Sequence, residues 1–459
     1  MLIVIPRYLE RLDPAEDRTR RMFTSMGVSA DTLESTAGQS VVLRLRRGAG
    51  TARALLAGQL LDLLVRLQPL VARVYLDCPD EREVVGDLPD RFPLELDDAG
   101  GLDGDGEALV VDVGEPQGTH DLLVDGAGWC LSADEGCEVA DDGNPIGPLA
   151  AAGVGAGEVF KLLFRQAHPP EPLSSRFVPQ HGCFSLFDYS ASQLSPPLDD
   201  VLSLDAVIVG VGGVGAGVLS VFAALGKRLV GRLVLIDDDT LDMYNLNRVT
   251  YARTADAEAE RLKVDAAAEF MRARAPNITT AEEPVAYKAY ARQWNRRADR
   301  KFALVLTGVD IDEIRWEVQR DLPRVLIDGA TGTQANCRVD RIGFGLAGCI
   351  GCARPPQPAR GDPDPAECDT PPARFAPSIS FNSAFAGVLV GAEALKVMGG
   401  SAGSSVLRSC LHLSAKSGPR WHPWVRPTVP CRVPGSLRTR GVSSEMGEIA
   451  RRQGTSGSL

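Results

Sequence analysis

The sequence predicts an α/β protein made of two tandem Rossmann-like, doubly wound domains, the first of them degenerate. Three observations predict this class: a strand that runs into a glycine-rich turn at residues 206–215, an earlier copy of the same order of elements, and an ordinary globular composition. The chain has 459 residues, 44% hydrophobic and 24% charged. That length is enough for two or three domains.

The clearest pattern is a strand, a glycine turn, a helix and a second strand at residues 206–237. Apolar runs at 206–209 and 233–236 predict the two strands, and Asp237 ends the second. The intervening glycines would let the backbone approach a phosphate: Gly210, Gly212, Gly213 and Gly215. A helix start supplies unpaired N–H groups, and an acid about 20 residues further on accepts hydrogen bonds from ribose hydroxyls. The pattern therefore predicts nucleotide binding.

Parts of the first half repeat parts of the second half in the same order. Three pairs of segments match: 41–77 with 206–237, 122–128 with 325–332, and 155–161 with 391–396. Three ordered matches indicate an internal duplication. The alternative is that any two Rossmann-like domains share such patterns.

The first copy differs from the second at the glycine turn. Arg46 and Arg47 precede Gly48 and Gly50, so side chains stand where bare backbone would face a phosphate. We therefore expect the first half to bind no nucleotide and to serve as a structural partner. The expected divisions are an inactive domain at 1–168, a Pro- and Ser-rich linker at 169–175, an active domain at 176–432 and a flexible tail at 433–459.

Charged residues beyond Asp237 suit a triphosphate better than a nicotinamide cofactor. Arg248 and Lys263 supply cations of the kind that β- and γ-phosphates need. Asp310 follows an apolar run at 302–308 and would lie at the edge of the sheet where ligands collect. A carboxylate there suits Mg²⁺. Taken singly, either cation is a typical surface charge, and Asp310 is a typical helix cap.

Together these motifs resemble the ThiF/MoeB/ubiquitin-activating superfamily, over roughly residues 176–432. Members adenylate the C-terminal carboxylate of a ubiquitin-like protein or a peptide, using ATP and Mg²⁺. The resemblance implies that Asp237 binds the ribose and that Asp310 coordinates Mg²⁺. It also implies a group around the phosphates and metal: Asp239, Asn245, Arg248 and Lys263. Arg315 matches a further family position, and Ile311 replaces the asparagine that usually follows the metal-binding aspartate.

The duplication resembles the eukaryotic activating enzymes, which pair an inactive adenylation half with an active one. We therefore expect an intramolecular pseudodimer. Family members also send an arginine from the partner half to ATP, and the motif that carries it reads Arg176 to Gln180 here, with Pro179 at one expected arginine position. Arg7 and Arg11 are the expected suppliers; the alternative is that both are surface charges.

Two groups of cysteines in the second half carry further expectations. Cys349 and Cys352 form a C-x2-C pair typical of half a structural zinc site. By resemblance, Cys431 belongs to the second pair, but proline stands at the fourth ligand position. Cys410, His412 or His422 would complete the site, or the metal is lost. The alternative is two buried thiols on a hairpin.

Cys368 lies in a proline-rich segment within 353–376, which matches the crossover loop where family members place a reactive cysteine. A thiolate there would attack the acyl-adenylate and form a thioester. Its acidic neighbours Glu367 and Asp369 would raise its pKa, and the alternative is an incidental exposed cysteine. The remaining cysteines are expected to be core residues: Cys78, Cys130, Cys183 and Cys337.

Composition narrows the class of partner. The net charge of −11 argues against a nucleic-acid binder. We find no apolar run of about 18 residues, so we expect no membrane-spanning helix. The start of the chain has no basic region followed by a cleavage site, so a cytoplasmic location is expected.

The most consistent function is adenylation of a ubiquitin-like protein that ends in glycine, followed by thioester formation on Cys368 and transfer to a conjugating enzyme. Some bacterial enzymes of this kind act in antiviral defence, a role that the sequence itself does not demonstrate. The alternatives are a peptide-modifying or sulfur-carrier adenylyltransferase without a cysteine intermediate, and a nucleotide- or NAD-binding protein without this activity.

Overall fold

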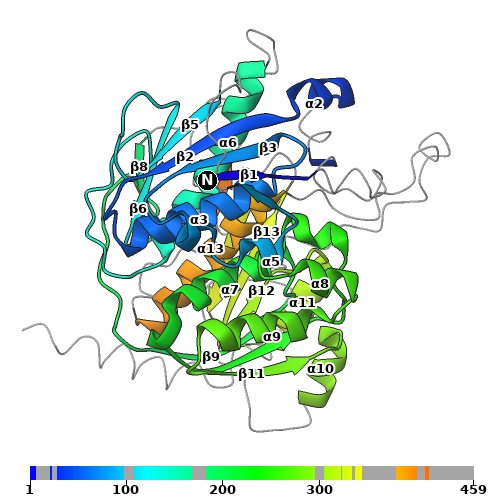
Figure 1. The fold of residues 1–459 in the computed structure, drawn as a ribbon. Coiled ribbons are helices and arrows are strands. Elements are labelled where there is room, and N and C mark those ends of the chain that lie inside the picture. The colour runs from blue at the N-terminus through cyan, green and yellow to red at the C-terminus, as the bar shows by residue number, and fades with distance from the viewer. Residues whose placement is uncertain are drawn as a thin grey trace, which may run out of the picture.

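The computed structural model describes most of both predicted halves. The described residues are 1–6, 21–22, 28–97, 108–167, 182–294, 304–321, 323–332, 336–343, 379–400 and 409–412. They form two large sheets with helices between and around them (Figure 1).

The first sheet is built almost entirely from the first half of the chain. Its strands lie in the order β4 (Glu95–Asp97), β1 (Leu2–Val4), β3 (Val71–Asp77), β2 (Gln39–Leu45), β5 (Leu109–Val113), β6 (Leu122–Ala127), β7 (Cys130–Ala133) and β8 (Gly182–Ser185). The central strands β3, β2, β5 and β6 are parallel, whereas β7 and β8 are antiparallel to their neighbours.

The second sheet follows the same plan. Its order is β11 (Ile278–Glu283), β10 (Leu229–Ile236), β9 (Leu202–Val209), β12 (Leu304–Thr307), β13 (Val325–Thr331), β14 (Asn336–Gly343) and β15 (Ser409–His412). Here β11, β10, β9, β12 and β13 are parallel, and β14 and β15 are antiparallel additions.

Six consecutive strands correspond between the sheets in order and direction, β3-β2-β5-β6-β7-β8 with β10-β9-β12-β13-β14-β15. The predicted fold class, two Rossmann-like α/β units in tandem, is therefore confirmed. The repeated topology also supports the internal duplication that the sequence predicts.

The strand that follows the predicted boundary at residue 176 joins the first sheet. Strand β8, Gly182–Ser185, pairs with β7 of the first sheet, with Ser132 opposite Cys183 and Cys130 opposite Ser185. The second domain, which the sequence predicts to begin at residue 176, therefore contributes this strand to the first sheet. The pairing covers β7, which would otherwise be an open edge strand.

Helices cover the sheets in the positions that strand–helix–strand units require. In the first half they are α2 (Ala30–Thr36), α3 (Thr51–Val65), α4 (Glu81–Val85), α5 (Leu88–Arg91) and α6 (Ile146–Ala167). In the second half they are α7 (Gly213–Leu225), η3 (Gly226–Arg228), η4 (Met243–Asn247), α8 (Thr254–Glu258), α9 (Lys263–Arg274), α10 (Tyr287–Trp294), α11 (Asp312–Arg320) and α13 (Ser380–Met398).

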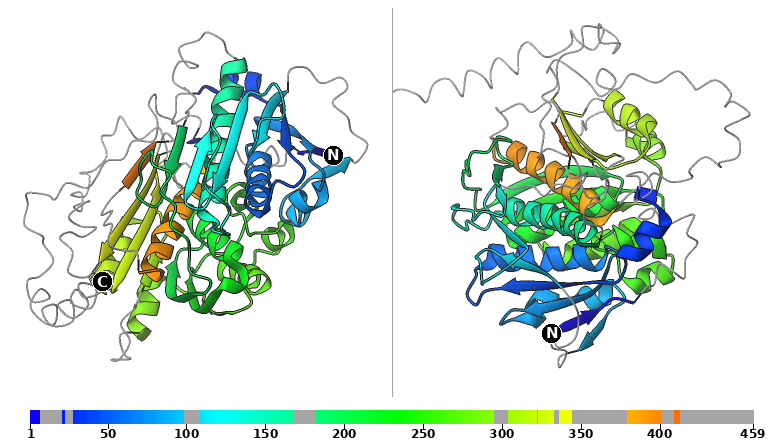
Figure 2. Two further views of the ribbon diagram at one scale, coloured as in Figure 1. Left: turned by 90° about the vertical axis from the view of Figure 1, so that its left-hand side faces the viewer. Right: turned by 90° about the horizontal axis from the view of Figure 1, so that it is seen from above.

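The corresponding helices α6 and α13 pack against each other between the two sheets (Figure 2). A Cβ atom at Gly153 would lie 3.1 Å from the Phe385 Cβ, and one at Gly157 would lie 3.5 Å from the Phe381 ring. Small residues on α6 therefore let aromatic side chains of α13 approach closely. This shared core joins the halves into the pseudodimer arrangement.

The two core helices are also long and apolar. Ile146–Arg165 and Ser380–Met398 are long and apolar enough to cross a membrane, but 94% and 89% of these windows are buried inside the molecule. Burial between two sheets accounts for their composition, as for the core helices of many large proteins.

Each core helix buries a glutamate and a lysine one turn apart. Glu158 and Lys161 pair on α6, and Glu393 Oε1 lies 2.6 Å from Lys396 Nζ on α13. Arg341 Nη1 lies 2.8 Å from Glu393 Oε2, and the Tyr189 hydroxyl donates to the same carboxylate. Glu393 thus neutralises two buried cations at the junction of the halves.

Candidate nucleotide-binding site

The glycine turn lies between β9 and α7, and each glycine has its own steric reason. Gly210 has a φ of +84°, and a Cβ there would lie 2.8 Å from the Val309 Cγ1. A Cβ at Gly215 would lie 2.4 Å from the Gly210 carbonyl oxygen. Around Gly212, by contrast, a Cβ would have no neighbour within 4 Å. The helix N-terminus is therefore bare and open, as phosphate binding requires.

The fourth glycine, Gly213, is packed against two site residues. A Cβ at this position would lie 3.0 Å from the Ser383 Cβ and 3.3 Å from the Arg248 Cγ. A larger residue would therefore displace Arg248, which the sequence predicts to bind phosphate. The glycine requirement here comes from tertiary packing and not from backbone conformation.

Asp237, at the end of β10, holds the glycine turn in place. Its Oδ2 accepts a hydrogen bond of 2.8 Å from the Val211 amide, and its Oδ1 accepts one of 3.0 Å from the Asp239 amide. Burial raises the pKa of this carboxyl, while Lys263 and these amides lower it. The carboxylate therefore links the ends of β9 and β10, and its predicted contact with ribose stays a prediction.

The two predicted cations are nearly buried. Lys263 begins α9, and its Nζ donates a hydrogen bond of 2.7 Å to Asp239 Oδ2. Arg248 follows η4, and its Nη1 donates to the Tyr244 carbonyl at 3.0 Å and to Asn247 Oδ1 at 2.9 Å. Because both cations are held by such contacts, their charges are fixed in position before any ligand binds.

Asp310 and Arg315 lie beyond the end of β12. Burial lowers the pKa of Arg315, but Asp328 and Asp312 together raise it above its usual value. Its Nε lies 3.0 Å from Asp328 Oδ1, and its Nη1 lies 2.6 Å from Asp312 Oδ1. Arg315 therefore anchors the start of α11 to β13 and fixes the loop that carries Asp310.

One cavity of about 660 Å³ brings the predicted residues together. Its lining includes each predicted ATP- or Mg²⁺-binding residue except Gly215: Gly210, Gly212, Gly213, Asp237, Asp239, Asn245, Arg248, Lys263 and Asp310. The volume falls within the range of small-molecule sites, roughly 300–1,000 Å³. Gly215 lies behind the lining, where it permits the close approach of helix and strand.

The cavity is also lined by a positively charged side chain that the sequence did not predict. Arg338, on β14, lines it and donates from Nη2 to Asp328 Oδ2 at 2.7 Å. Asp328 in turn accepts from Thr307 Oγ1 at 2.5 Å. The only signal in the sequence was the match of 325–332 to 122–128, which marks Asp328 but does not assign it partners.

The carboxylates of the cavity offer two places for a cation. Asp237, Asp238 and Asp239 each present an oxygen within 4.8 Å of the others, and Asp310 lines the same cavity but is not part of this group. Mg²⁺ needs only one or two protein oxygens when phosphates supply the rest. The donor set therefore fits Mg²⁺, with Asp310 as the predicted ligand.

Several predicted features fall outside the described residues. These are the linker, the tail, the crossover segment 353–376, the zinc ligands Cys349, Cys352 and Cys431, the reactive Cys368, and the arginines Arg7, Arg11 and Arg176. For Cys410 and His412, only the backbone of β15 is described.

In the first half a carboxylate lies at the N-terminus of α3, whereas the N-terminus of the corresponding helix α7 in the second half has no side-chain cap. Asp141 Oδ2 accepts hydrogen bonds from the Ala52 amide at 2.9 Å and from Thr51 Oγ1 at 2.8 Å, at the first turn of α3. Burial raises the pKa of Asp141, but these hydrogen bonds lower it below its usual value. A protein carboxylate thus takes the place of a phosphate, which supports the expectation that this half binds no nucleotide.

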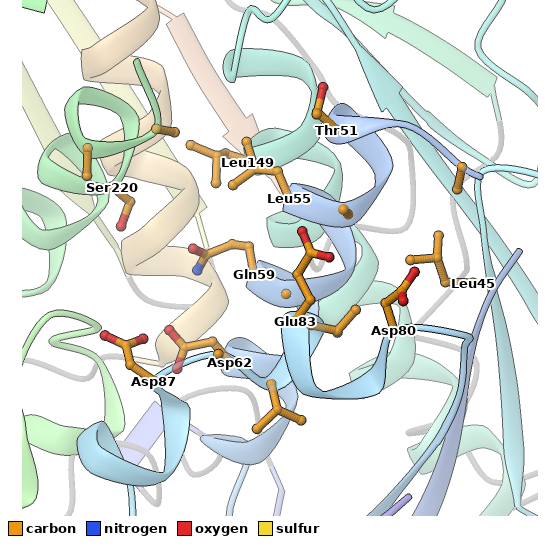
Figure 3. Close-up of a pocket in the computed structure, with 18 of the residues that line it drawn as sticks. Leu45, Thr51, Leu55, Gln59, Asp62, Asp80, Glu83, Asp87, Leu149 and Ser220 are labelled. Carbon is orange, nitrogen blue, oxygen red and sulfur yellow. The ribbon is translucent and has the colours of Figure 1, made fainter. Parts of the chain in front are cut away.

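A second cavity of about 660 Å³ runs from the glycine turn of the first half along α3 to the second half (Figure 3). The labelled carboxylates Asp62, Asp80, Glu83 and Asp87 line it. Asp62 and Asp87 are paired with arginines of the same lining, Arg91 with both and Arg274 with Asp87. The cavity therefore combines acidic and basic side chains at the contact between the two halves.

Two arginines of the first half contact the segment that carries Asn245 and Arg248. Arg66 is fully buried and donates from Nη1 to the Leu246 carbonyl. Arg91 Nη1 donates to the Thr250 carbonyl at 2.6 Å. The inactive half therefore positions the η4 segment of the active half through backbone contacts.

We expect Arg66→Met to weaken both stability and nucleotide binding. The variant keeps an aliphatic side chain. It removes the guanidinium that pairs with Asp62 Oδ1 at 2.7 Å, and with it the hydrogen bond to η4. Removing one partner of a buried ion pair costs about 3–5 kcal/mol, and the low end applies because Arg91 still pairs with Asp62. Urea unfolding and ATP calorimetry measure the two effects. The control is Arg46→Met, at an exposed pair with Glu115; equal behaviour of both variants would contradict this role.

Fold and site together define an α/β protein with two Rossmann-like units. The second unit has an open glycine turn beside a cavity, and the first has a carboxylate at the corresponding turn. Residues 188–427 match the ThiF family, and the chain belongs to that family, within the ThiF/MoeB/ubiquitin-activating superfamily.

Curated relatives match the chain over short stretches. The Nedd8-activating enzyme E1 catalytic subunit of Drosophila melanogaster is 31% identical over 171 residues, 33% of this chain and 36% of that protein. The SAMP-activating enzyme E1 of Haloferax volcanii is 38% identical over 85 residues, 18% of this chain and 29% of that protein. The chain thus spans about a third of the length of these relatives.

Solved structures are similar over about half of the chain. A crystal structure of E. coli MccB with MccA-N7isoASN has a TM-score of 0.41 and 18% identity, covering 50% of this chain and 66% of that one. A structure of PaaA has a TM-score of 0.34 and 21% identity, covering 45% and 60%.

Proposed function

We propose that the chain adenylates the C-terminal carboxylate of a ubiquitin-like protein that ends in glycine. The observation that carries this proposal is the single cavity lined by an uncapped helix N-terminus and by two nearly buried cations, Arg248 and Lys263. Membership of the ThiF family and two relatives named as activating enzymes for Nedd8 and SAMP support the choice of substrate.

The proposed first step transfers AMP from ATP. A carboxylate oxygen attacks the α-phosphorus, a new O–P bond forms, and the bond to the oxygen bridging to the β-phosphate breaks. Pyrophosphate leaves with that electron pair. Arg248 and Lys263 offset the charge that develops on it, and their fixed positions avoid reorganisation during the step.

The remaining residues of the cavity hold the reactants. The glycine turn contributes backbone N–H groups to the phosphates, Asp237 lies within reach of the ribose, and Asp239 and Asn245 border the phosphates. Mg²⁺, when bound, offsets phosphate charge, with Asp310 as its protein ligand. Catalysis in this arrangement is mostly positioning and electrostatic stabilisation.

Pyrophosphate exchange tests this function. Labelled pyrophosphate should enter ATP only when the purified chain is given a polypeptide that ends in glycine. The matched control is the same polypeptide with a C-terminal carboxamide, which removes the attacking oxygen. Calorimetry that finds tight NADH binding and no ATP binding would overturn the proposal. An Asp310→Ala variant with full exchange activity would refute the assignment of the metal ligand.

The second proposed step places the acyl group on Cys368. Its thiolate attacks the acyl carbon, a thioester bond forms and AMP leaves. We expect Cys368→Ala to retain pyrophosphate exchange but to lose the reducible adduct with the substrate, as seen on non-reducing gels. Cys78→Ala, at a half-buried cysteine, is the control and should keep the adduct.

An adduct that persists in Cys368→Ala would place the thioester elsewhere. Exchange without any adduct in the wild type would favour the second candidate, a peptide-modifying or sulfur-carrier adenylyltransferase. That candidate shares the ATP residues and needs no cysteine, and the bare turn and cations of the cavity support it equally.

The wider setting is part of the same proposal. We place the reaction in the cytoplasm, with a conjugating enzyme as the next acceptor, and antiviral defence is one setting for such a system. Zinc at Cys349, Cys352 and Cys431 would hold the end of the active domain together. Neighbouring genes test the substrate class, since a small ubiquitin-like reading frame ending in glycine is expected.

A further inference from the structure

Two cysteines of one segment, Cys130 and Cys137, meet a third from a later strand, Cys183, in the first half of the molecule. The sulfur atoms of Cys130, Cys137 and Cys183 all lie within 4.8 Å of one another. Cys130 is buried, and the other two are half-buried. Cys130 is buried as the sequence predicts, but the expectation that Cys183 is a core residue is wrong, because its side chain is only half-buried.

The register of β7 and β8 places two of the thiols on one face of the sheet. Cys130 lies opposite Ser185, and Cys183 lies opposite Ser132, so the two cysteines are diagonal neighbours. Diagonal positions are about 7–8 Å apart, whereas a disulfide needs Cα atoms about 4.4–6.8 Å apart. This pair is better arranged to share an ion than to form a bond.

The third thiol comes from the segment that follows β7. Cys137 donates its amide to Asp125 Oδ2 at 2.9 Å, and Asp125 Oδ1 lies 3.2 Å from Arg53 Nε. The segment is therefore fixed to β6 and α3.

We propose that Cys130, Cys137 and Cys183 bind one zinc ion. Zn–S bonds of about 2.3 Å in tetrahedral geometry put sulfur atoms about 3.8 Å apart, and the three sulfur atoms lie within 4.8 Å of one another. Three thiolates from the described residues leave the fourth position to water or to a small exogenous ligand. Soft thiolate donors of this kind select zinc over magnesium or calcium.

This site differs from the zinc site predicted at Cys349, Cys352 and Cys431, because it uses other cysteines and lies in the inactive half. It joins β7, the segment after β7, and β8, the last strand before the chain enters the second half. The ion would therefore fix the point where the chain leaves the first sheet. The proposal does not depend on the adenylation activity.

Zinc content of the purified full-length chain tests the proposal. Cys137→Ser should lose about one zinc per chain, measured by plasma mass spectrometry, whereas Cys78→Ser should lose none. To separate the two sites, Cys137→Ser is also made in a Cys349→Ser/Cys352→Ser background, where the same loss is expected. Unchanged zinc content in both backgrounds would overturn the proposal.

A second measurement uses the wild-type protein and does not require a variant to fold. Alkylation mapped by peptide mass spectrometry should find Cys137 and Cys183 protected, and a chelator should expose both without unfolding the chain. Rapid alkylation before chelation would overturn the proposal. A disulfide between any two of the three cysteines in protein without zinc would do the same.

Discussion

Replacing Arg248 by alanine should lower kcat/KM for adenylation about 100- to 1,000-fold, the usual effect of removing one preorganised charge from a transition state. The guanidinium lines the nucleotide cavity and is only 8% exposed. Its charge therefore acts in a poorly solvated site, where it offsets the leaving pyrophosphate strongly. Initial rates of pyrophosphate exchange at varied ATP concentration measure the change.

The matched control for this prediction is Arg253→Ala. Arg253 lies five residues further on, is exposed, and pairs with Glu269 at 2.9 Å outside the cavity. We expect it to change the rate less than twofold, an order-of-magnitude estimate from the weakness of surface ion pairs. An Arg248→Ala variant as active as this control would contradict the proposed electrostatic role. Arg248→Lys should recover part of the rate, since it restores the charge without the planar fork.

Replacing Glu393 by alanine should lower the free energy of unfolding by about 3–5 kcal/mol. The carboxylate is 1% exposed and lies beside Lys396 and Arg341. Its removal leaves two buried cations without their counter-charge and deprives Tyr189 of an acceptor. Urea unfolding at neutral pH measures the loss.

This loss of stability should shrink as the pH rises. Burial lowers the pKa of Lys396, and Glu393 counteracts part of that effect, so the variant should release the lysine proton at lower pH than the wild type. The unfolded chain keeps the proton until the usual lysine pKa is reached. Between the folded and unfolded pKa values of Lys396 the unfolded state binds more protons, so the free energy of unfolding rises with pH. This rise begins at lower pH in the variant than in the wild type, and the difference between them therefore shrinks.

Glu269→Ala provides the comparison for Glu393. Glu269 is exposed and pairs with Arg253 and Arg261, so its removal should cost less than about 1 kcal/mol. Equal losses for the two variants would show that the network around Glu393 contributes no more than a surface pair. A loss that grows with pH would contradict the assignment to Lys396.

The grouping of the predicted ATP-site residues in one cavity could be expected almost completely from the sequence. Gly210, Asp237, Lys263 and Asp310 each lie at the end of a strand or the start of a helix in the βαβ order, and parallel strands bring such positions to one sheet edge. The cavity confirms that they lie together. Local order along the chain was sufficient because the topology of such sheets is restricted.

Contacts between distant segments could not be predicted in this way. The Arg66 contact with Leu246 joins residues 180 positions apart, and the Asp141 contact with Ala52 joins residues 89 apart. Neither arginine nor aspartate has a local pattern that specifies such a partner. Arg338 was missed for the same reason, since an arginine on a strand is ordinary until the strand is placed beside the cavity.

The order of apolar runs, glycine turns and helical segments along the chain was enough to predict the architecture and the sheet edge where the candidate site lies. These features each depend on only a few neighbouring residues. Only the folded molecule decided that β8 completes the first sheet, that Cys130, Cys137 and Cys183 meet, and that Asp141 accepts hydrogen bonds at the first turn of α3. These outcomes depend on strand register and on the packing of one half against the other. Both are set by the burial of whole surfaces, which no short stretch of sequence contains.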